Sequence, residues 1–132
     1  MVTGIEHVGI AAKDTVALTE WYKRMFGVEV VYDNKKTPPT YFVKFSSGDM
    51  IEIYPGDECG GAHEKGNKTG GIRHIALGLS FDDFDAVADA VLKEGAPIVT
   101  PVSKTDAGVA TLFFRDPEGN ILHLIARKKP LF

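Results

Sequence analysis

The sequence has one cysteine, no long hydrophobic run and no marked excess of charge. Because Cys59 is the single cysteine among 132 residues, no disulfide can form within the chain, and a lone thiol is usual in a reducing compartment. The net charge of -3 indicates neither a nucleic acid nor a membrane surface as partner. No window approaches the roughly 18 apolar residues of a membrane-spanning helix, and the first residues lack the features of a secretory signal. We therefore expect a cytoplasmic protein.

What the chain does contain is an internal repeat. The segment IEHVGIA (residues 5–11) returns as IRHIALG (residues 72–78), and each copy has a histidine at its third position. Both copies are rich in β-branched and small residues, which is typical of a buried strand. The two histidines are His7 and His74. The repeat therefore predicts two related modules within one short chain.

A helix and three further strands follow the first copy. Asp14 or Thr15 is placed to cap the helix, and Gly27 is placed to end it in the left-handed conformation. The apolar face of this helix is predicted to consist of Leu18, Trp21, Tyr22 and Met25. The three strands are read from VEVVYD, TYFVKF and MIEIY, with a turn at SSGD before the last of them. The first module is therefore predicted to be βαβββ.

The same order follows the second copy. The predicted helical face ends before Gly95 and consists of Phe84, Val87, Ala88 and Val91. The later strands are read from APIVT, VATLFFR and ILHLIA, with a hairpin turn at DPEGN. Gly48 and Gly119 are expected to supply positive φ in the two matching turns. The second module is therefore also predicted to be βαβββ.

The predicted domain organisation is two modules, residues 1–57 and 70–132, joined by a linker loop over residues 58–69. Modules of about 60 residues would be marginal alone, so we expect them to share one core. Cys59 and His63 fall in the Gly-rich linker, where they are expected to be an incidental thiol and a solvated side chain.

Strand alternation places four metal-ligand side chains on one face. On the first strand of each module, the histidine points away from the apolar residues that pack on the helix. On the last strand, Glu52 and His123 also point away from the helix, and each stands the same distance beyond the turn glycine of its module. The set is His7, Glu52, His74 and His123. Three imidazoles that meet a carboxylate predict a divalent metal site, although singly each histidine is explained as well by a hydrogen bond and Glu52 by an arginine partner.

The motifs resemble those of the vicinal oxygen chelate superfamily, which includes glyoxalase I, methylmalonyl-CoA epimerase, extradiol dioxygenases and the fosfomycin and bleomycin resistance proteins. The resemblance covers nearly the whole chain and is carried by IEHVGIAAKD, WYKRMFG, IRHIALGL and FFRDPEGNILHLI. It implies an α+β fold in which two βαβββ modules form a partly open, eight-stranded mixed barrel with the helices outside.

The resemblance also implies the same four metal ligands, with one departure. Glyoxalase-like members bind the metal through a histidine and a carboxylate or glutamine from one module and a histidine and a glutamate from the other. This chain has His123 where the family most often has glutamate. In glyoxalase I two ligand glutamates exchange a proton between adjacent carbons, so the departure leaves Glu52 as the single catalytic base.

Three functions follow as expectations. The first is a glyoxalase-type lyase or isomerase, in which a divalent ion (Zn, Ni, Co or Fe) chelates two neighbouring oxygens of a small-molecule substrate and stabilises an enolate. The second is an Fe(II) extradiol-type dioxygenase, whose facial triad would consist of His7, His74 and Glu52. The third is a metal-free protein that sequesters an antibiotic or other small molecule.

The partners are expected to be a small-molecule substrate and a second copy of the chain, because family members pair modules either within one chain or between two. Tyr54 and Tyr41 are candidates for lining the site, and either is equally well a packed aromatic residue of the sheet. Candidates for binding an anionic tail of the substrate are Lys44, Arg73 and Arg115, with ordinary solvation as the alternative.

Overall fold

The computed structural model describes residues 1–57 and 64–132. Cys59 and His63 lie outside the described residues. Among the described residues, neither helix has the length and hydropathy needed to cross a membrane.

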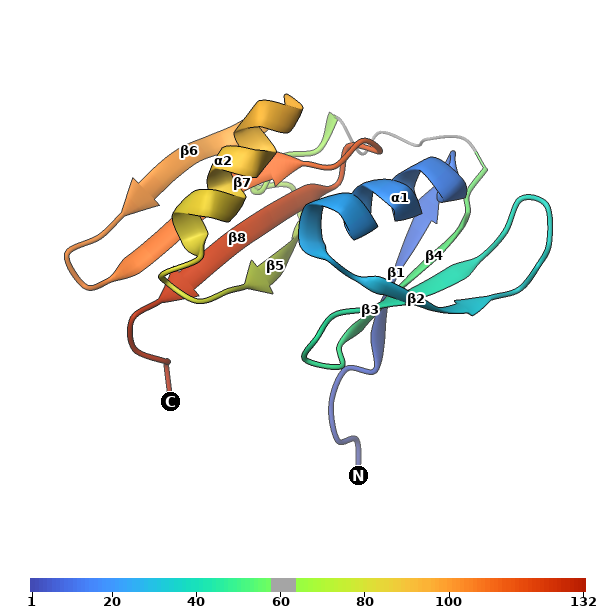
Figure 1. Ribbon diagram of the computed structural model, residues 1–132, viewed down its shortest axis with the longest axis horizontal. Coiled ribbons are helices and arrows are strands. Elements are labelled where there is room, and N and C mark those ends of the chain that lie inside the picture. Colours follow the sequence, from blue (N-terminus) through green and yellow to red (C-terminus); the bar gives the residue numbers. More distant parts are fainter. Residues whose placement is uncertain (58–63) are drawn as a thin grey trace. The chain divides into compact units, whose positions relative to one another are not determined.

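The chain divides into two compact units, Met1–Gly60 and Gly61–Phe132. Each unit has the order strand, helix and three strands, so the predicted βαβββ repeat and the α+β fold class are confirmed (Figure 1).

The first unit is a four-stranded mixed sheet with one helix on it. Its elements are β1 (His7–Ala12), α1 (Thr15–Phe26), β2 (Glu29–Asp33), β3 (Tyr41–Lys44) and β4 (Met50–Pro55). The strand order is β1-β4-β3-β2, in which β1 runs parallel to β4 and the other neighbours are antiparallel. Helix α1 packs on β3 and β4 (Figure 1). The central strand β4 therefore has neighbours on both edges and the helix on one face.

The second unit repeats this topology. Its elements are β5 (His74–Gly78), α2 (Phe84–Glu94), β6 (Ile98–Lys104), β7 (Val109–Arg115) and β8 (Ile121–Arg127). The strand order is β5-β8-β7-β6, again with one parallel pair, β5 with β8. Helix α2 packs on β8, so β8 is the counterpart of β4.

Helix α1 begins, and both helices end, where local chemistry predicts. The Asp14 side chain accepts a hydrogen bond of 2.9 Å from the Ala17 backbone N–H, which satisfies one orphan donor of the first turn of α1. Gly27 and Gly95 follow the helices with φ of 66° and 78°, a left-handed conformation that glycine adopts without a Cβ clash. The predicted N-cap of α1 and the predicted ends of both helices are therefore confirmed, with Asp14 rather than Thr15 as the cap.

Each helix covers the apolar face of its sheet. In the first unit the buried hydrophobic residues are Ile10, Ala12, Leu18, Trp21, Tyr22, Val28, Val43, Ile51 and Ile53. In the second unit they are Phe84, Ala88, Val91, Ala110, Leu112, Phe114, Ile121, Leu122, Leu124 and Ala126. Ile51 and Ile53 on β4 alternate with Glu52, which leaves Glu52 on the face away from the helix.

The first strand of each unit starts later than the apolar pattern suggests, at the histidine itself. β4 begins at Met50, shortly after the turn at Gly48, and Met50 is the residue that pairs with His7. In the same way, β8 begins at Ile121, which pairs with His74. Each histidine is therefore the first residue of its strand.

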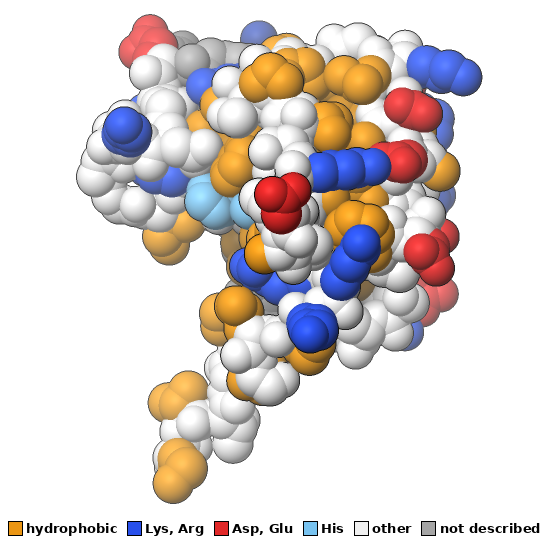
Figure 2. Space-filling view, turned by 90° about the vertical axis from the view of Figure 1, so that its left-hand side faces the viewer, with side chains coloured by type: hydrophobic (Ala, Val, Ile, Leu, Met, Phe, Trp, Pro, Cys, Tyr) orange, Lys and Arg blue, Asp and Glu red, His pale blue; other side chains and the backbone are white. Residues whose placement is uncertain are grey.

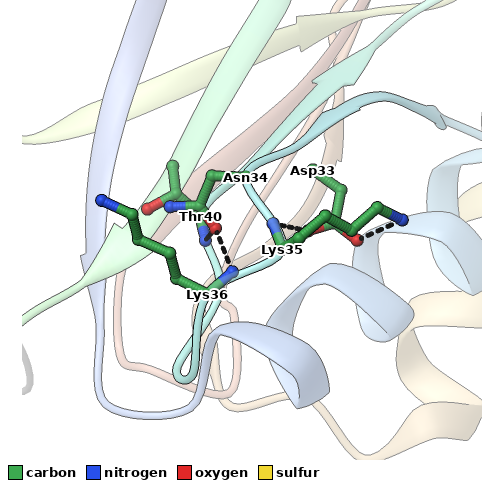
Figure 3. Close-up of polar contacts among 5 residues, drawn as sticks. All are labelled: Asp33, Asn34, Lys35, Lys36 and Thr40. Carbon is green, nitrogen blue, oxygen red and sulfur yellow. Dashed lines mark hydrogen bonds and ion pairs between the residues drawn. The ribbon is translucent and has the colours of Figure 1, made fainter.

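The loop between β2 and β3 is ordered by its own side chains (Figure 3). Asn34 Oδ1 accepts hydrogen bonds from the backbone N–H of Lys36, at 3.1 Å, and of Thr40, at 2.9 Å. Asp33 Oδ1 accepts from the backbone N–H of Lys35, at 2.8 Å, and its other oxygen lies 3.4 Å from Lys35 Nζ. These contacts close the loop at the outer edge of the sheet.

Candidate functional site

The first unit brings His7 and Glu52 together. Gly9 lies two residues after His7 on β1, and it pairs with Glu52 on the adjacent strand β4. His7 Nε2 lies 3.7 Å from Glu52 Oε1, which is too long for a hydrogen bond. Two donors that bind one ion at about 2.1 Å each are separated by up to about 4.2 Å. The pair is therefore spaced as two ligands of one metal ion are.

Two further contacts hold the His7 ring. Its Nδ1 contacts Glu6 Oε2, and the ring meets the Phe42 ring in a T-shaped arrangement at a centroid distance of 5.1 Å. Phe42 lies on β3 directly opposite Glu52, so its side chain shares the face of Glu52. The ring of His7 is thus held by a carboxylate at one nitrogen and by the ring of Phe42, while its other nitrogen lies near Glu52.

Gly9, on the strand next to Glu52, leaves room for the ring of Tyr54. A Cβ on Gly9 would lie 3.2 Å from the Tyr54 ring and 3.8 Å from Glu52 Oε1. Tyr54 therefore lies on the face of Glu52, as expected for a residue that lines the site. Tyr41 does not, because it pairs with Ile53, whose side chain is buried on the helix face.

The second unit brings His74 and His123 together. Their rings lie 5.3 Å apart between centroids and meet at 89°. Phe113 stacks on His123 at 3.8 Å, with 11° between the planes, and it meets His74 edge-on at 5.3 Å. His74 Nδ1 is 2.9 Å from Asn67 Oδ1. Figure 2 shows histidine side chains at the surface, bordered by hydrophobic side chains.

His123 is the most buried of the four predicted ligands. Its residue is 9% exposed, and its Nε2 is buried without a hydrogen-bond partner among the described residues. Burial, together with the smaller effect of the nearby His74 and Arg127 charges, lowers the pKa of His123 from 6.5 to about 4. The ring is therefore neutral at pH 7, the state in which an imidazole nitrogen binds a metal ion.

The four predicted ligands thus form two pairs, one in each unit. Within residues 1–57 and 64–132, no group of three or more His, Cys, Asp or Glu side chains lies close enough to hold a metal ion. The convergence of all four residues on one ion stays a prediction.

Two of the cations proposed for an anionic tail differ in their surroundings. Lys44 Nζ lies 3.0 Å from Glu29 Oε1, so a neighbouring strand already provides its counter-charge. Arg73 Nε is buried and has no hydrogen-bond partner in the part of the chain that the structure describes.

The third cation, Arg115, joins two segments. Its Nη1 donates to the Gly119 carbonyl at 2.8 Å, and its Nη2 donates to the Lys65 carbonyl at 3.1 Å. The guanidinium of Arg115 therefore holds the segment before β5 against the DPEGN turn.

The sequence predictions missed four residues that contact the two ligand pairs. Phe42 and Phe113 occupy equivalent places in the two modules, since each pairs with the central-strand ligand of its own unit, so the repeat itself could have indicated them. Glu6 directly precedes His7, but nothing in its position indicated a contact with the ring. Asn67 lies in the predicted linker, and the sequence carried no signal for its contact with His74.

Comparison with known proteins gives matches over most of the chain. Residues 4–124 match the profile of the Glyoxalase/Bleomycin resistance protein/Dioxygenase superfamily. Biphenyl-2,3-diol 1,2-dioxygenase 3 from Rhodococcus globerulus is 28% identical over 121 residues, which are 91% of this chain and 61% of that protein. The chain thus spans less than two thirds of the length of that relative.

Solved structures match the fold. The genomically encoded fosfomycin resistance protein FosX from Listeria monocytogenes, complexed with Mn(II) and sulfate ion, has a TM-score of 0.74 at 20% identity over 97% of this chain and 93% of that one. A glyoxylase/bleomycin resistance protein/dioxygenase domain from Frankia sp. EAN1pec has a TM-score of 0.73 at 19% identity, over 97% of this chain and 100% of that one. At these identities the likeness shows the fold.

Proposed function

This chain belongs to the Glyoxalase/Bleomycin resistance protein/Dioxygenase superfamily, and from that premise we propose that it is a metal-dependent lyase or isomerase acting on a small molecule with two neighbouring oxygens. In this proposal one divalent ion is held by two side chains from each unit: His7, Glu52, His74 and His123.

The observation that carries the proposal is the state of His123. A buried nitrogen without a partner is unfavourable, since burial removes the water that would otherwise bind it. A metal ion at Nε2 would satisfy this nitrogen, and the ring is neutral as binding requires. Three imidazoles and one carboxylate suit Zn, Ni, Co or Fe(II). The Mn(II) in the FosX crystal supports a divalent ion at family level.

The side chains of the first unit suit proton transfer. When bound, a divalent ion acts as a Lewis acid that stabilises negative charge on the two substrate oxygens. Glu52 is the base in our proposal, because its side chain is 29% exposed and a general base must be within reach of the substrate proton. Tyr54 lies next to it and would contact the substrate from the same face.

Metal content tests the site. We expect about one ion per chain by elemental analysis after reloading with Zn, Ni, Co or Fe, and a fall in affinity of about 100-fold or more in both His7→Ala and His74→Ala. Glu20→Ala, on the exposed side of α1, is the matched control and should bind as the wild type does. Loss of binding in one histidine variant alone would mean that the ion belongs to one unit, and no binding at all would leave metal-free sequestration of a small molecule as the function.

Proton exchange tests the reaction. An α-hydroxycarbonyl or 2-oxoaldehyde adduct incubated in D2O with the metal-loaded protein should exchange its α-proton, as measured by NMR. Glu52→Gln should slow this exchange by about 10²- to 10⁴-fold, because general base catalysis contributes about that much. Equal exchange rates in the two proteins would contradict the role of Glu52.

A second candidate is an Fe(II) extradiol dioxygenase, favoured by the 28% identity to the biphenyl-2,3-diol dioxygenase. His7, His74 and Glu52 supply two histidines and one carboxylate, the ligand set that such enzymes use. Oxygen consumption by Fe(II)-loaded protein with biphenyl-2,3-diol, without proton exchange in the carbonyl substrates, would select this candidate over the first.

A homodimer is also part of the proposal, and complementation tests how the units combine. If a site takes one unit from each of two copies, mixing His7→Ala with His74→Ala creates one intact site per mixed dimer, and metal binding returns. If each site is built from one chain, every site in the mixture lacks a histidine, and binding stays lost.

A further inference from the structure

We infer that Glu6 and Asn67 are positioning residues, each of which holds Nδ1 of one site histidine so that Nε2 is the atom presented to a metal ion. The purpose of this arrangement rests on the proposed function, but the arrangement itself can be tested in the metal-free protein.

In the first unit the acceptor is a carboxylate. Glu6 Oε2 contacts His7 Nδ1, and an ionised carboxylate only accepts hydrogen bonds. The proton of neutral His7 must then be on Nδ1, which leaves the lone pair on Nε2. That nitrogen is the one 3.7 Å from Glu52 Oε1. The Phe42 ring, which meets the His7 ring at 77° and 5.1 Å between centroids, limits rotation out of this position.

In the second unit the acceptor is an amide. Asn67 Oδ1 lies 2.9 Å from His74 Nδ1, and an amide oxygen also only accepts. His74 therefore takes the same tautomer as His7, with its lone pair on Nε2. Two histidines at matching places in the repeat reach the same state through unrelated partners.

The segment that bears Asn67 is itself held in place. The Thr69 N–H donates to the Gly66 carbonyl at 3.1 Å, which closes a turn around Asn67. Arg115 donates to the Lys65 carbonyl directly before this turn. This part of the predicted linker is therefore a support for the second histidine pair.

The two partners should differ in strength. A carboxylate at the far nitrogen makes an imidazole a better donor to a metal ion, and loss of such partners lowers metal affinity by about 10- to 100-fold. An amide fixes the ring without adding charge. We therefore expect loss of Glu6 to weaken metal binding more than loss of Asn67.

Histidine NMR of the metal-free protein is the direct test. Long-range ¹H–¹⁵N spectra at pH 8 should show the Nδ1–H tautomer for His7 and His74 in the wild type. Glu6→Leu should convert His7 to a mixture of tautomers and leave His74 unchanged, and Asn67→Leu should do the reverse. Glu6→Gln is the conservative variant, because its amide oxygen still accepts: it should restore the tautomer but not the full metal affinity. Glu20→Leu is the control for removal of an exposed carboxylate.

The outcomes separate this inference from the proposed function. Unchanged tautomers in Glu6→Leu and Asn67→Leu, with backbone spectra of folded protein, would overturn the inference whether or not metal binds. Tautomers that change as expected in a protein that binds no metal would uphold the positioning roles and overturn the metal site.

Discussion

The two histidine pairs share a backbone arrangement and differ in their chemistry. In each unit the histidine begins an edge strand that runs parallel to a central strand, and the second ligand lies on that central strand. In the first unit His7 lies between two carboxylates, Glu6 and Glu52. In the second unit His74 meets another imidazole and an amide. The repeated backbone therefore sets the positions of the candidate ligands, and the residue types at those positions set the charge of each pair.

Burial separates the pairs as well. The side chains of His7 and Glu52 are 34% and 29% exposed, whereas His123 is almost fully covered and stacked on Phe113. A partly hydrated carboxylate suits proton transfer, and a covered neutral imidazole suits holding an ion. In the site that we propose, the two copies of a duplicated module therefore contribute different chemistry from equivalent positions.

The largest effect that we expect from this difference is a pH dependence of stability in the metal-free protein. The pKa of His123 is about 4 when folded, against an ordinary 6.5, so the unfolded chain binds more protons between these values. The free energy of unfolding should therefore fall as the pH drops from about 6.5 to 4, by up to about 3 kcal/mol from this residue. Urea unfolding in EDTA at a series of pH values measures it.

His123→Gln is the reference for this measurement, since glutamine does not titrate. As the pH drops from about 6.5 to 4, the unfolding free energy of the wild type should fall relative to that of His123→Gln by up to about 3 kcal/mol. A difference that stays constant with pH would contradict the burial of a neutral ring.

Making the second pair resemble the first should have the next largest effect. His123→Glu places a carboxylate in a covered position, and we expect it to lower the stability of the metal-free protein at pH 7 by about 2 kcal/mol. Added Zn²⁺ should offset this loss, because the carboxylate then has a cation. The matched change, Glu52→His, is made at a more exposed position and should lower stability by less than about 1 kcal/mol. Urea unfolding at pH 7 measures both variants, and equal losses would show that burial does not distinguish the pairs.

The two phenylalanines give the smallest expected effect. Phe113 stacks face to face on His123, whereas the rings of Phe42 and His7 form a T-shaped pair. We expect Phe113→Leu to lower the free energy of unfolding by about 1 kcal/mol and Phe42→Leu by about half of that. Urea unfolding at pH 7.5 measures both, and a larger loss for Phe42→Leu would reverse the comparison.

Much of the fold could be predicted because its signals are local. Asp14 begins α1 through its side-chain cap, and Gly27 ends it because glycine has no Cβ to oppose the left-handed conformation. Strand alternation placed Glu52 and His123 on the sheet face away from the helix. The same reasoning did not exclude Tyr41 from the site face, because the face of Tyr41 depends on which residue it opposes on β4.

The site was predictable in its candidate ligands but not in their partners. Glu6, Asn67 and Arg115 act through contacts that no periodicity encodes, and the Arg115 contact with Lys65 joins residues 50 positions apart.

The residue pattern alone was enough to predict the two modules, their helices and the positions of the four candidate ligands, because side-chain alternation and helix capping depend on near neighbours in the chain. The packed structure was needed to show that His123 is covered by Phe113 and neutral at pH 7, that Glu6 and Asn67 contact the Nδ1 atoms of His7 and His74, and that Arg115 holds the segment of Asn67. Burial and contacts of this kind depend on how the chain has packed, which the local pattern of residue types does not encode.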